Sequence, residues 1–223
     1  MTSVIGEVIP LAVGVAISPI PIIAAILMLL SPRAKSTSVA FLGGWIVGIV
    51  VAIVVFTLLS SVLPQGDTGA PSRTAGVIKI VLGGLLLVVA ARQWRGRPAE
   101  GEEAVLPKWM SAIDSMTPVK GLGLGFLLAS VNPKNLLLAA SAGLIVGSAQ
   151  LTSGGITVVV IVFTMLAGCT VIIPVIAYLI ASERMRGPLE GLRRWLVANN
   201  ATIIAVLLLV IGVSVIGKGL ESF

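Results

Sequence analysis

The sequence predicts an all-α integral membrane protein with six transmembrane helices arranged as two inverted three-helix repeats. Three observations lead to this fold class: the composition, the lengths of the apolar runs, and two proline motifs half a chain apart. Of the 223 residues, 57% are hydrophobic and 11% are charged, whereas about a quarter of the residues in soluble domains are charged. A domain of this size could not hide so much apolar side chain from water, which excludes a soluble enzyme, a disordered chain and a disulfide scaffold.

Six apolar runs are long enough to cross a hydrocarbon core of about 30 Å. Each run is expected to be a helix, because a lone lipid-facing strand would leave its backbone groups unpaired. The third and sixth runs are close to the short limit for a span. The expected spans are residues 4–30, 39–62, 75–91, 121–146, 154–181 and 201–217.

The spans divide the chain into three parts. Residues 1–95 are expected to form the first three-helix repeat and residues 121–223 the second. Between them, residues 96–120 are expected to be a cytoplasmic linker, with three glutamates in its first part and an amphipathic helix at 106–116. A second short amphipathic helix, at 188–197, is expected to lie on the inner leaflet.

Basic residues outside the spans set the orientation. Eleven Lys and Arg residues flank one side of the predicted spans, and only Arg73 and Lys218 flank the other. Because cytoplasmic loops collect Lys and Arg, both termini are expected to be extracytoplasmic, in a multi-pass protein of the inner (plasma) membrane. This bias also accounts for the net charge of +6, so nucleic acid is not an expected partner.

Two polar motifs that contain proline interrupt the first and fourth spans. The first is Ser-Pro-Ile-Pro at residues 18–21, and the second is Asn-Pro-Lys-Asn at residues 132–135. Each opens a unit of three spans, so the second unit must insert upside down relative to the first. In secondary transporters with such inverted repeats, paired broken helices mark the substrate site. The expected substrate-binding residues are Ser18, Pro19, Pro21, Asn132, Pro133, Lys134 and Asn135, with Thr170 and Pro174 lining the same cavity.

Lys134 is the one charge expected near the membrane centre. Placing a lysine there costs on the order of 2.5–3.5 kcal/mol, so its ammonium group needs a partner: substrate, water or the carbonyl groups freed by the prolines. The positive end of the half-helix that starts near Pro133 points to the same place. This chemistry favours a phosphate, sulfate or carboxylate group over a metal cation. The alternative is a kinked helix whose polar residues only repair the kink, since proline is common in membrane helices.

Groups that could carry out catalysis are scarce. The chain has no histidine and one cysteine, Cys169, and no Asp or Glu lies deep in a predicted span. Intramembrane catalysis needs a titratable set, so no enzyme activity, no metal site and no cofactor are expected. A Ser18–Lys134 dyad is the one catalytic alternative, and it requires the two broken helices to touch.

Four further motifs carry a resemblance to a known family. They are Ser-Pro-Arg-Ala at residues 31–34, Phe-Leu-Gly-Gly-Trp at 41–45, Trp-Met-Ser-Ala-Ile-Asp at 109–114 and Val-Asn-Pro-Lys-Asn-Leu at 131–136. With the motif at 18–21, they resemble the LysE superfamily of small six-helix exporters, and more closely its GAP branch of glycopeptidolipid- and sulfolipid-addressing proteins. Metal and cation exporters of the superfamily carry acidic or histidine residues inside their spans, and this chain carries neither.

The resemblance implies an inner-membrane transporter, or a transport accessory, that moves a polar-headed or anionic envelope glycolipid or a small solute outward. Two alternatives stay open: a LysE-like exporter of amino acids or ions, and a structural partner of a larger lipid exporter without its own substrate site. The partners implied are membrane lipids, a larger lipid exporter and a second copy of the chain. The Gly44–Gly48 spacing would suit such a homo-oligomer, although packing within the chain explains it better.

Overall fold

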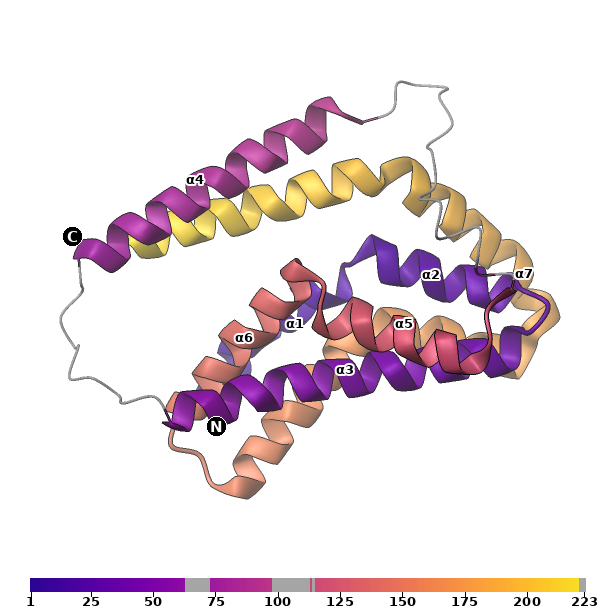
Figure 1. The fold of residues 1–223 in the computed structure, drawn as a ribbon, viewed down its shortest axis with the longest axis horizontal. Helices are drawn as coiled ribbons and strands as arrows, with labels where there is room; N and C mark the ends of the chain where they lie inside the picture. Colours follow the sequence, from indigo (N-terminus) through magenta and orange to yellow (C-terminus); the bar gives the residue numbers. More distant parts are fainter. Residues whose placement is uncertain (63–72, 98–112, 114, 221–223) are drawn as a thin grey trace. The chain divides into compact units, whose positions relative to one another are not determined.

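Every element of the computed structural model is a helix within the residues it describes, which are 1–62, 73–97, 113 and 115–220 (Figure 1). The longest helices are α7, with 68 residues, and α3, with 29. In chain order the helices are α1 (Thr2–Ala16), α2 (Pro19–Leu30), α3 (Ala34–Val62), α4 (Arg73–Arg95), α5 (Pro118–Ser130), α6 (Pro133–Ser148) and α7 (Ser153–Leu220).

The lengths and apolarity of these helices are those of a membrane protein. Among the described residues, α3 and α7 are each long and apolar enough to cross a bilayer. Two bent pairs also qualify when each is taken as one span: α1 with α2, bent by 54°, and α5 with α6, bent by 62°. The described residues therefore hold two candidate spans, or up to four with the bent pairs. Six spans in an inverted repeat stay a prediction.

All six predicted runs lie in helices. The first and fourth correspond to the bent pairs, the second to α3 and the third to α4. The fifth and sixth both fall within α7, whose helical geometry is interrupted at Ala181. The predicted amphipathic helix at 188–197 is a continuation of α7 rather than a separate element, with Leu189 and Leu196 buried and Trp195 exposed.

The chain forms two compact units. One comprises Met1–Leu63 with Leu106–Arg194, and the other comprises Pro64–Val105 with Trp195–Phe223. These units are groups of residues that pack together, whereas the predicted repeats are stretches of sequence. The division into repeats at 1–95 and 121–223 stays a prediction. The linker predicted at 96–120 and its helix at 106–116 lie largely outside the described residues, although Ile113 is buried.

Three helices begin with proline immediately after a polar residue. Pro19, Pro118 and Pro133 occupy the first turns of α2, α5 and α6. Proline suits this position, because its missing N–H would have no partner within the helix and its φ is already helical. At α5 the side chain of Thr117 accepts a hydrogen bond from the backbone N–H of Lys120, and so caps the helix.

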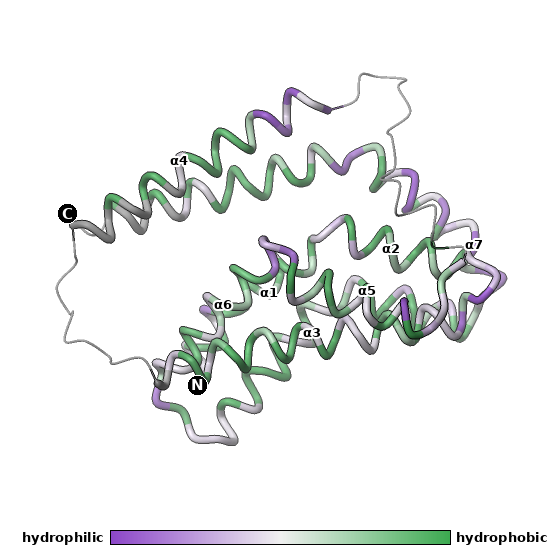
Figure 2. The backbone as a smooth tube through the Cα atoms, in the orientation of Figure 1, coloured by the Kyte–Doolittle hydropathy of each residue, from purple (hydrophilic) through white to green (hydrophobic). Residues whose placement is uncertain are grey.

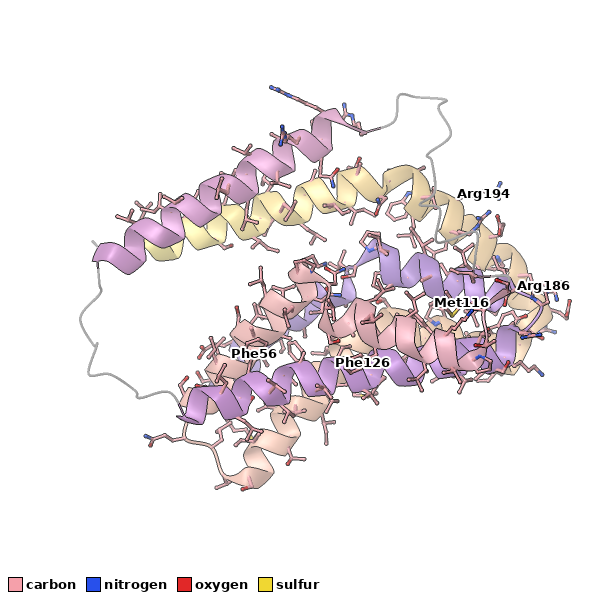
Figure 3. All side chains as sticks on the ribbon, in the orientation of Figure 1. Phe56, Met116, Phe126, Arg186 and Arg194 are labelled. Carbon is pink, nitrogen blue, oxygen red and sulfur yellow. The ribbon has the colours of Figure 1, made fainter. Side chains whose placement is uncertain are left out.

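In the larger unit, α3 lies along both halves of the α5–α6 pair (Figure 1). Glycines make the approach close: a Cβ added to Gly48 would lie 2.6 Å from the Cβ of Ala129, and one added to Gly143 would lie 2.7 Å from that of Phe56. Figure 3 shows Phe126 on α5 and Phe56 on α3, at these two stretches of contact. Both sides of the bend between α5 and α6 therefore pack against α3.

Hydropathy varies along the larger unit in the way a membrane protein requires. Figure 2 shows hydrophobic residues along α2 and α3, and hydrophilic residues where α2 ends and α3 begins. Arg33 lies in that turn and Lys35 in the first turn of α3, and both are exposed. In the smaller unit, α4 packs on the last part of α7, where a Cβ on Gly212 would lie 2.9 Å from Leu87.

Candidate functional site

The break between α1 and α2 follows from two prolines. In a continuous helix, the carbonyl groups of Val15 and Ile17 would accept hydrogen bonds from residues 19 and 21, but both positions are proline and have no N–H. The N–H of Ser18 turns to the carbonyl of Ala16 at 2.9 Å, which leaves the carbonyl of Gly14 without its helical donor. Such freed carbonyls need other donors inside a membrane protein.

The break between α5 and α6 has the same cause. Pro133 has no N–H for the carbonyl of Ala129, and α5 ends one turn before it. The side chain of Asn132 caps α6 by accepting a hydrogen bond from the N–H of Lys134 at 3.1 Å. The amide nitrogen of Asn135 donates to the carbonyl of Leu128 at 3.1 Å, and so supplies a donor within its own break.

The two breaks meet. The hydroxyl of Ser18 donates to the Oδ1 of Asn135 at 2.9 Å, and both side chains are buried. Ser18 makes no side-chain cap bond to α2, where Pro21, the third residue of the helix, has no N–H to donate. A close approach of the helices supports the contact, because a Cβ on Gly14 would lie 2.9 Å from the side chain of Leu138 on α6.

Lys134 crosses from the second break to the first. Its Nζ donates to the carbonyl of Gly14 at 2.7 Å and to the carbonyl of Ile17 at 3.0 Å. The freed carbonyls, one of the three partners that the sequence suggests, are thus within hydrogen-bond distance of Lys134. The ammonium has three N–H groups and these two bonds use two of them. Among the described residues no ion pair neutralises its charge.

The fifth span adds one polar contact to the breaks. The hydroxyl of Thr170 on α7 donates to the carbonyl of Ala16 at 2.8 Å, so α7 joins the two bent helix pairs at this point. The structure therefore brings together five of the predicted residues: Ser18, Asn132, Lys134, Asn135 and Thr170.

The prolines among the predicted residues shape the breaks and make no polar contact there. Pro19 and Pro21 are buried in the first turn of α2, whereas Pro133 is exposed. Pro174 lies inside α7, one turn beyond Thr170, and is partly buried. Nothing in the sequence singled out the backbone acceptors on Gly14, Ala16 and Leu128. The N–H groups that the prolines lack would have served the carbonyls of Val15, Ile17 and Ala129, so no count from the prolines alone locates these three acceptors.

Comparison with known proteins agrees with the motifs. The family model described as "Sap, sulfolipid-1-addressing protein" matches residues 8–221, a range that includes both breaks. The match confirms the resemblance to the sulfolipid-addressing branch. No curated protein and no solved structure matches this chain.

Proposed function

The chain belongs to the family of sulfolipid-1-addressing proteins, and from this premise we propose that it moves, or helps to move, an anionic envelope lipid outward across the inner membrane. In this proposal six spans form two inverted repeats of the LysE type, with both termini extracytoplasmic. The two breaks lie near the bilayer midplane, and the headgroup passes between them. The chain does no chemistry on its substrate.

One observation carries the proposal: the ammonium of Lys134 lies where two broken helices cross, with one N–H free of the carbonyls of Gly14 and Ile17. The ammonium is partly buried, so its charge is screened less than at an exposed site and attracts an anion more strongly. Helices α2 and α6 both begin at this crossing, and the dipole of each helix favours negative charge at its N-terminus. A sulfate or phosphate headgroup matches these features.

The decisive experiment separates the charge of Lys134 from its hydrogen bonds. Purified protein in liposomes is given a fluorescent sulfated glycolipid, and the exposure of the label to a membrane-impermeant quencher measures transport. Lys134→Gln keeps donors for the carbonyls but removes the charge, so we expect transport to fall at least about tenfold while stability changes little. Lys134→Met removes both the charge and the hydrogen-bond donors. Lys134→Arg should retain part of the transport.

Lys120→Met is the matched control, because that lysine is exposed at the start of α5 and its side chain lies outside the breaks. It should transport at the wild-type rate. Wild-type transport by Lys134→Gln would contradict the proposed anion site. If the wild-type protein moves a labelled anion or amino acid but no lipid, the small-solute alternative holds. A wild-type protein that moves neither, yet is required for surface lipid in cells, would be an accessory of a larger exporter.

A further inference from the structure

Five basic side chains of the larger unit are exposed and form no ion pair within the described residues. The two ion pairs found there are Arg186 with Glu183, at 3.9 Å, and Arg193 with Glu190, at 2.6 Å. A lone cation at a surface is ordinary, so these five become informative only if they gather at one place. They are Arg33, Lys35, Lys120, Arg184 and Arg194.

Helices α3 and α5 bring three of these cations to one end of the unit. A Cβ on Gly121 would lie 3.0 Å from the carbonyl oxygen of Thr37, and farther along both helices one on Gly48 would lie 2.6 Å from the Cβ of Ala129. The two helices therefore run in the same direction and start at the same end. Lys120 directly precedes Gly121, which places it beside the start of α3, where two of the other cations lie.

Helix α7 returns to the same end. Near the far end of α3, a Cβ on Gly147 of α6 would lie 2.6 Å from the carbonyl oxygen of Thr57, and α7 begins shortly after α6. Gly168 then lies beside Ile46, partway back along α3. From Gly168 to Ala181 the helix covers about 20 Å, and α3 covers about 18 Å from Ile46 back to its first residue. The stretch of α7 after Ala181 therefore lies level with the start of α3 (Figure 1).

Beyond Ala181 this stretch buries one face and exposes the other. Leu189 is buried, at 2% exposed. Arg184 and Arg194 each lie five residues from it, about 140° around the helix axis, and both are exposed. Figure 3 shows Arg186 on this stretch, at the same end as Met116, which comes shortly before α5. We call this end, with its five cations that lack an ion pair, the basic end.

Exposed apolar side chains lie next to these cations. Val119, which precedes Lys120, is 80% exposed, and Val39, one turn after Lys35, is 47% exposed. On the last stretch of α7, Leu192 is 39% exposed. In a membrane protein such neighbours suit the headgroup level, where acyl chains cover the apolar side chain and the basic group reaches the phosphates. A partner that offers both kinds of surface is a lipid.

We propose that the basic end binds anionic phospholipids of the bilayer itself, in the leaflet that the positive-inside rule predicts to be cytoplasmic. The inference goes beyond the proposed function, because these residues are not those of the breaks and the bound lipid is a fixed neighbour rather than the lipid that is moved. A phosphate diester carries one negative charge, and a guanidinium group can donate two hydrogen bonds to it. A zwitterionic lipid also carries a cation, which the basic end repels.

Lipid retained by the purified protein in detergent tests this inference. The protein is incubated with phosphatidylglycerol, or with phosphatidylcholine that has the same acyl chains, and passed through a sizing column, after which mass spectrometry measures the bound lipid. We expect phosphatidylglycerol to be retained and phosphatidylcholine to be lost. The difference should disappear at about 1 M salt, where charges are screened beyond about 3 Å.

Two substitutions on separate helices test the residues. Arg33→Gln combined with Arg184→Gln should weaken the affinity for phosphatidylglycerol about 25-fold, since each basic residue at an anionic membrane surface contributes about fivefold. Both side chains are exposed, so the thermal unfolding midpoint without lipid should not change. Arg33→Lys combined with Arg184→Lys keeps both charges and should retain most of the binding.

Glu190→Gln combined with Arg193→Gln is the matched control. It removes a cation from the same stretch of α7, but one already paired at 2.6 Å, so the net charge of this end stays the same and binding should match the wild type. In liposomes phospholipid is in large excess. The loss of one cation then leaves the basic end occupied, and Lys120→Met stays a valid control for transport.

Three results would overturn the basic end: equal retention of the two phospholipids, binding that persists at about 1 M salt, or wild-type binding by Arg33→Gln combined with Arg184→Gln. Poly-glutamate and the sulfated glycolipid are tested in the same way. Retention of poly-glutamate without phosphatidylglycerol would overturn the proposal and assign this end to an acidic protein segment. Retention of the sulfated glycolipid alone would overturn it and assign the end to loading of the transported lipid.

Failure of the proposed function looks different. The wild-type protein then moves no sulfated lipid in liposomes, or Lys134→Gln moves it at the wild-type rate, whatever the basic end binds.

Discussion

At the residue scale, the amide of Asn135 connects the two breaks. Its nitrogen donates to Leu128 within its own break, and its oxygen accepts from Ser18 in the other. Both ends of one planar group are therefore used, and its exposed fraction is 1%. Lys134 reaches across in the same direction, through the carbonyls of Gly14 and Ile17. The crossing is held by partners that are far apart in the sequence.

This arrangement predicts unequal costs for truncating the two hydrogen-bonded residues. Ser18→Ala leaves one buried acceptor without its donor and should lower the free energy of unfolding by about 1–3 kcal/mol. Asn135→Ala leaves both Ser18 and Leu128 without partners and should cost more. Reversible unfolding in detergent, followed in a double-mutant cycle, should give a coupling of at least about 0.5 kcal/mol.

The control for this cycle is Ser141→Ala, on the same helix as Asn135. That hydroxyl is exposed and bonds only to the carbonyl of Leu137 in the preceding turn. Its loss should change stability by less than about 0.5 kcal/mol. Additive effects of Ser18→Ala and Asn135→Ala would show that the contact between the breaks contributes nothing.

At the element scale, glycine decides how closely α5 can approach α3. Gly121, Gly123 and Gly125 alternate along α5, but only two of them face a neighbour. A Cβ on Gly125 would lie 2.9 Å from the backbone nitrogen of Trp45, and one on Gly121 would lie 3.0 Å from the carbonyl oxygen of Thr37. Backbone atoms cannot yield as a flexible side chain can. Small residues serve this purpose in many membrane helix pairs.

Neighbouring glycines therefore provide a matched pair of substitutions. Gly125→Ala should force α5 away from α3 and destabilise the protein by about 1–3 kcal/mol, the usual cost of overpacking. Gly123 has no neighbouring atom within 4 Å of the added Cβ. Gly123→Ala should then be neutral, or stabilising by up to about 1 kcal/mol through helix propensity.

The measurement is the thermal midpoint of both variants in detergent, together with lipid transport. Because the α5–α6 bend rests against α3, Gly125→Ala should also reduce transport per folded protein. Equal behaviour of the two alanine variants would contradict the packing argument.

At the scale of the whole molecule, orientation follows from charge. The exposed Arg33 lies in the turn between α2 and α3, and the exposed Lys35 lies in the first turn of α3. Arg184, Arg186 and Arg194 are exposed on α7 beyond Ala181. Figure 3 shows Arg186 and Arg194 on this stretch of α7. If the chain has the six proposed spans, the positive-inside rule predicts that these segments face the cytoplasm and that both termini lie outside.

Reporter fusions test this topology. A reporter that is active only in the cytoplasm should give no signal at either terminus, and a full signal when inserted after Arg186. Equal expression of the three fusions, measured by an epitope tag, is the control. A bright C-terminal fusion would contradict the six-span topology and, with it, the inverted repeat.

Several properties of this protein were determined by sequence alone. Composition and run length predict a helical membrane protein, and each of the six predicted runs is helical in the structure. The breaks were predictable because proline lacks an N–H and favours the first turn of a helix, which are local effects. The family was predictable because its motifs are contiguous stretches of chain.

Only the tertiary structure decided which groups pair at the breaks. Proline frees a carbonyl locally, but the donor that reaches it depends on where another helix crosses. Lys134 therefore had three conceivable partners, and the crossing of α1 and α6 brings the carbonyls of Gly14 and Ile17 within hydrogen-bond distance of it. That the buried Nε1 of Trp45 has no partner among the described residues was equally hidden, since no local pattern records whether a neighbour is within hydrogen-bonding distance. Hydrogen bonds act over about 3 Å, so partners distant in sequence are set by packing.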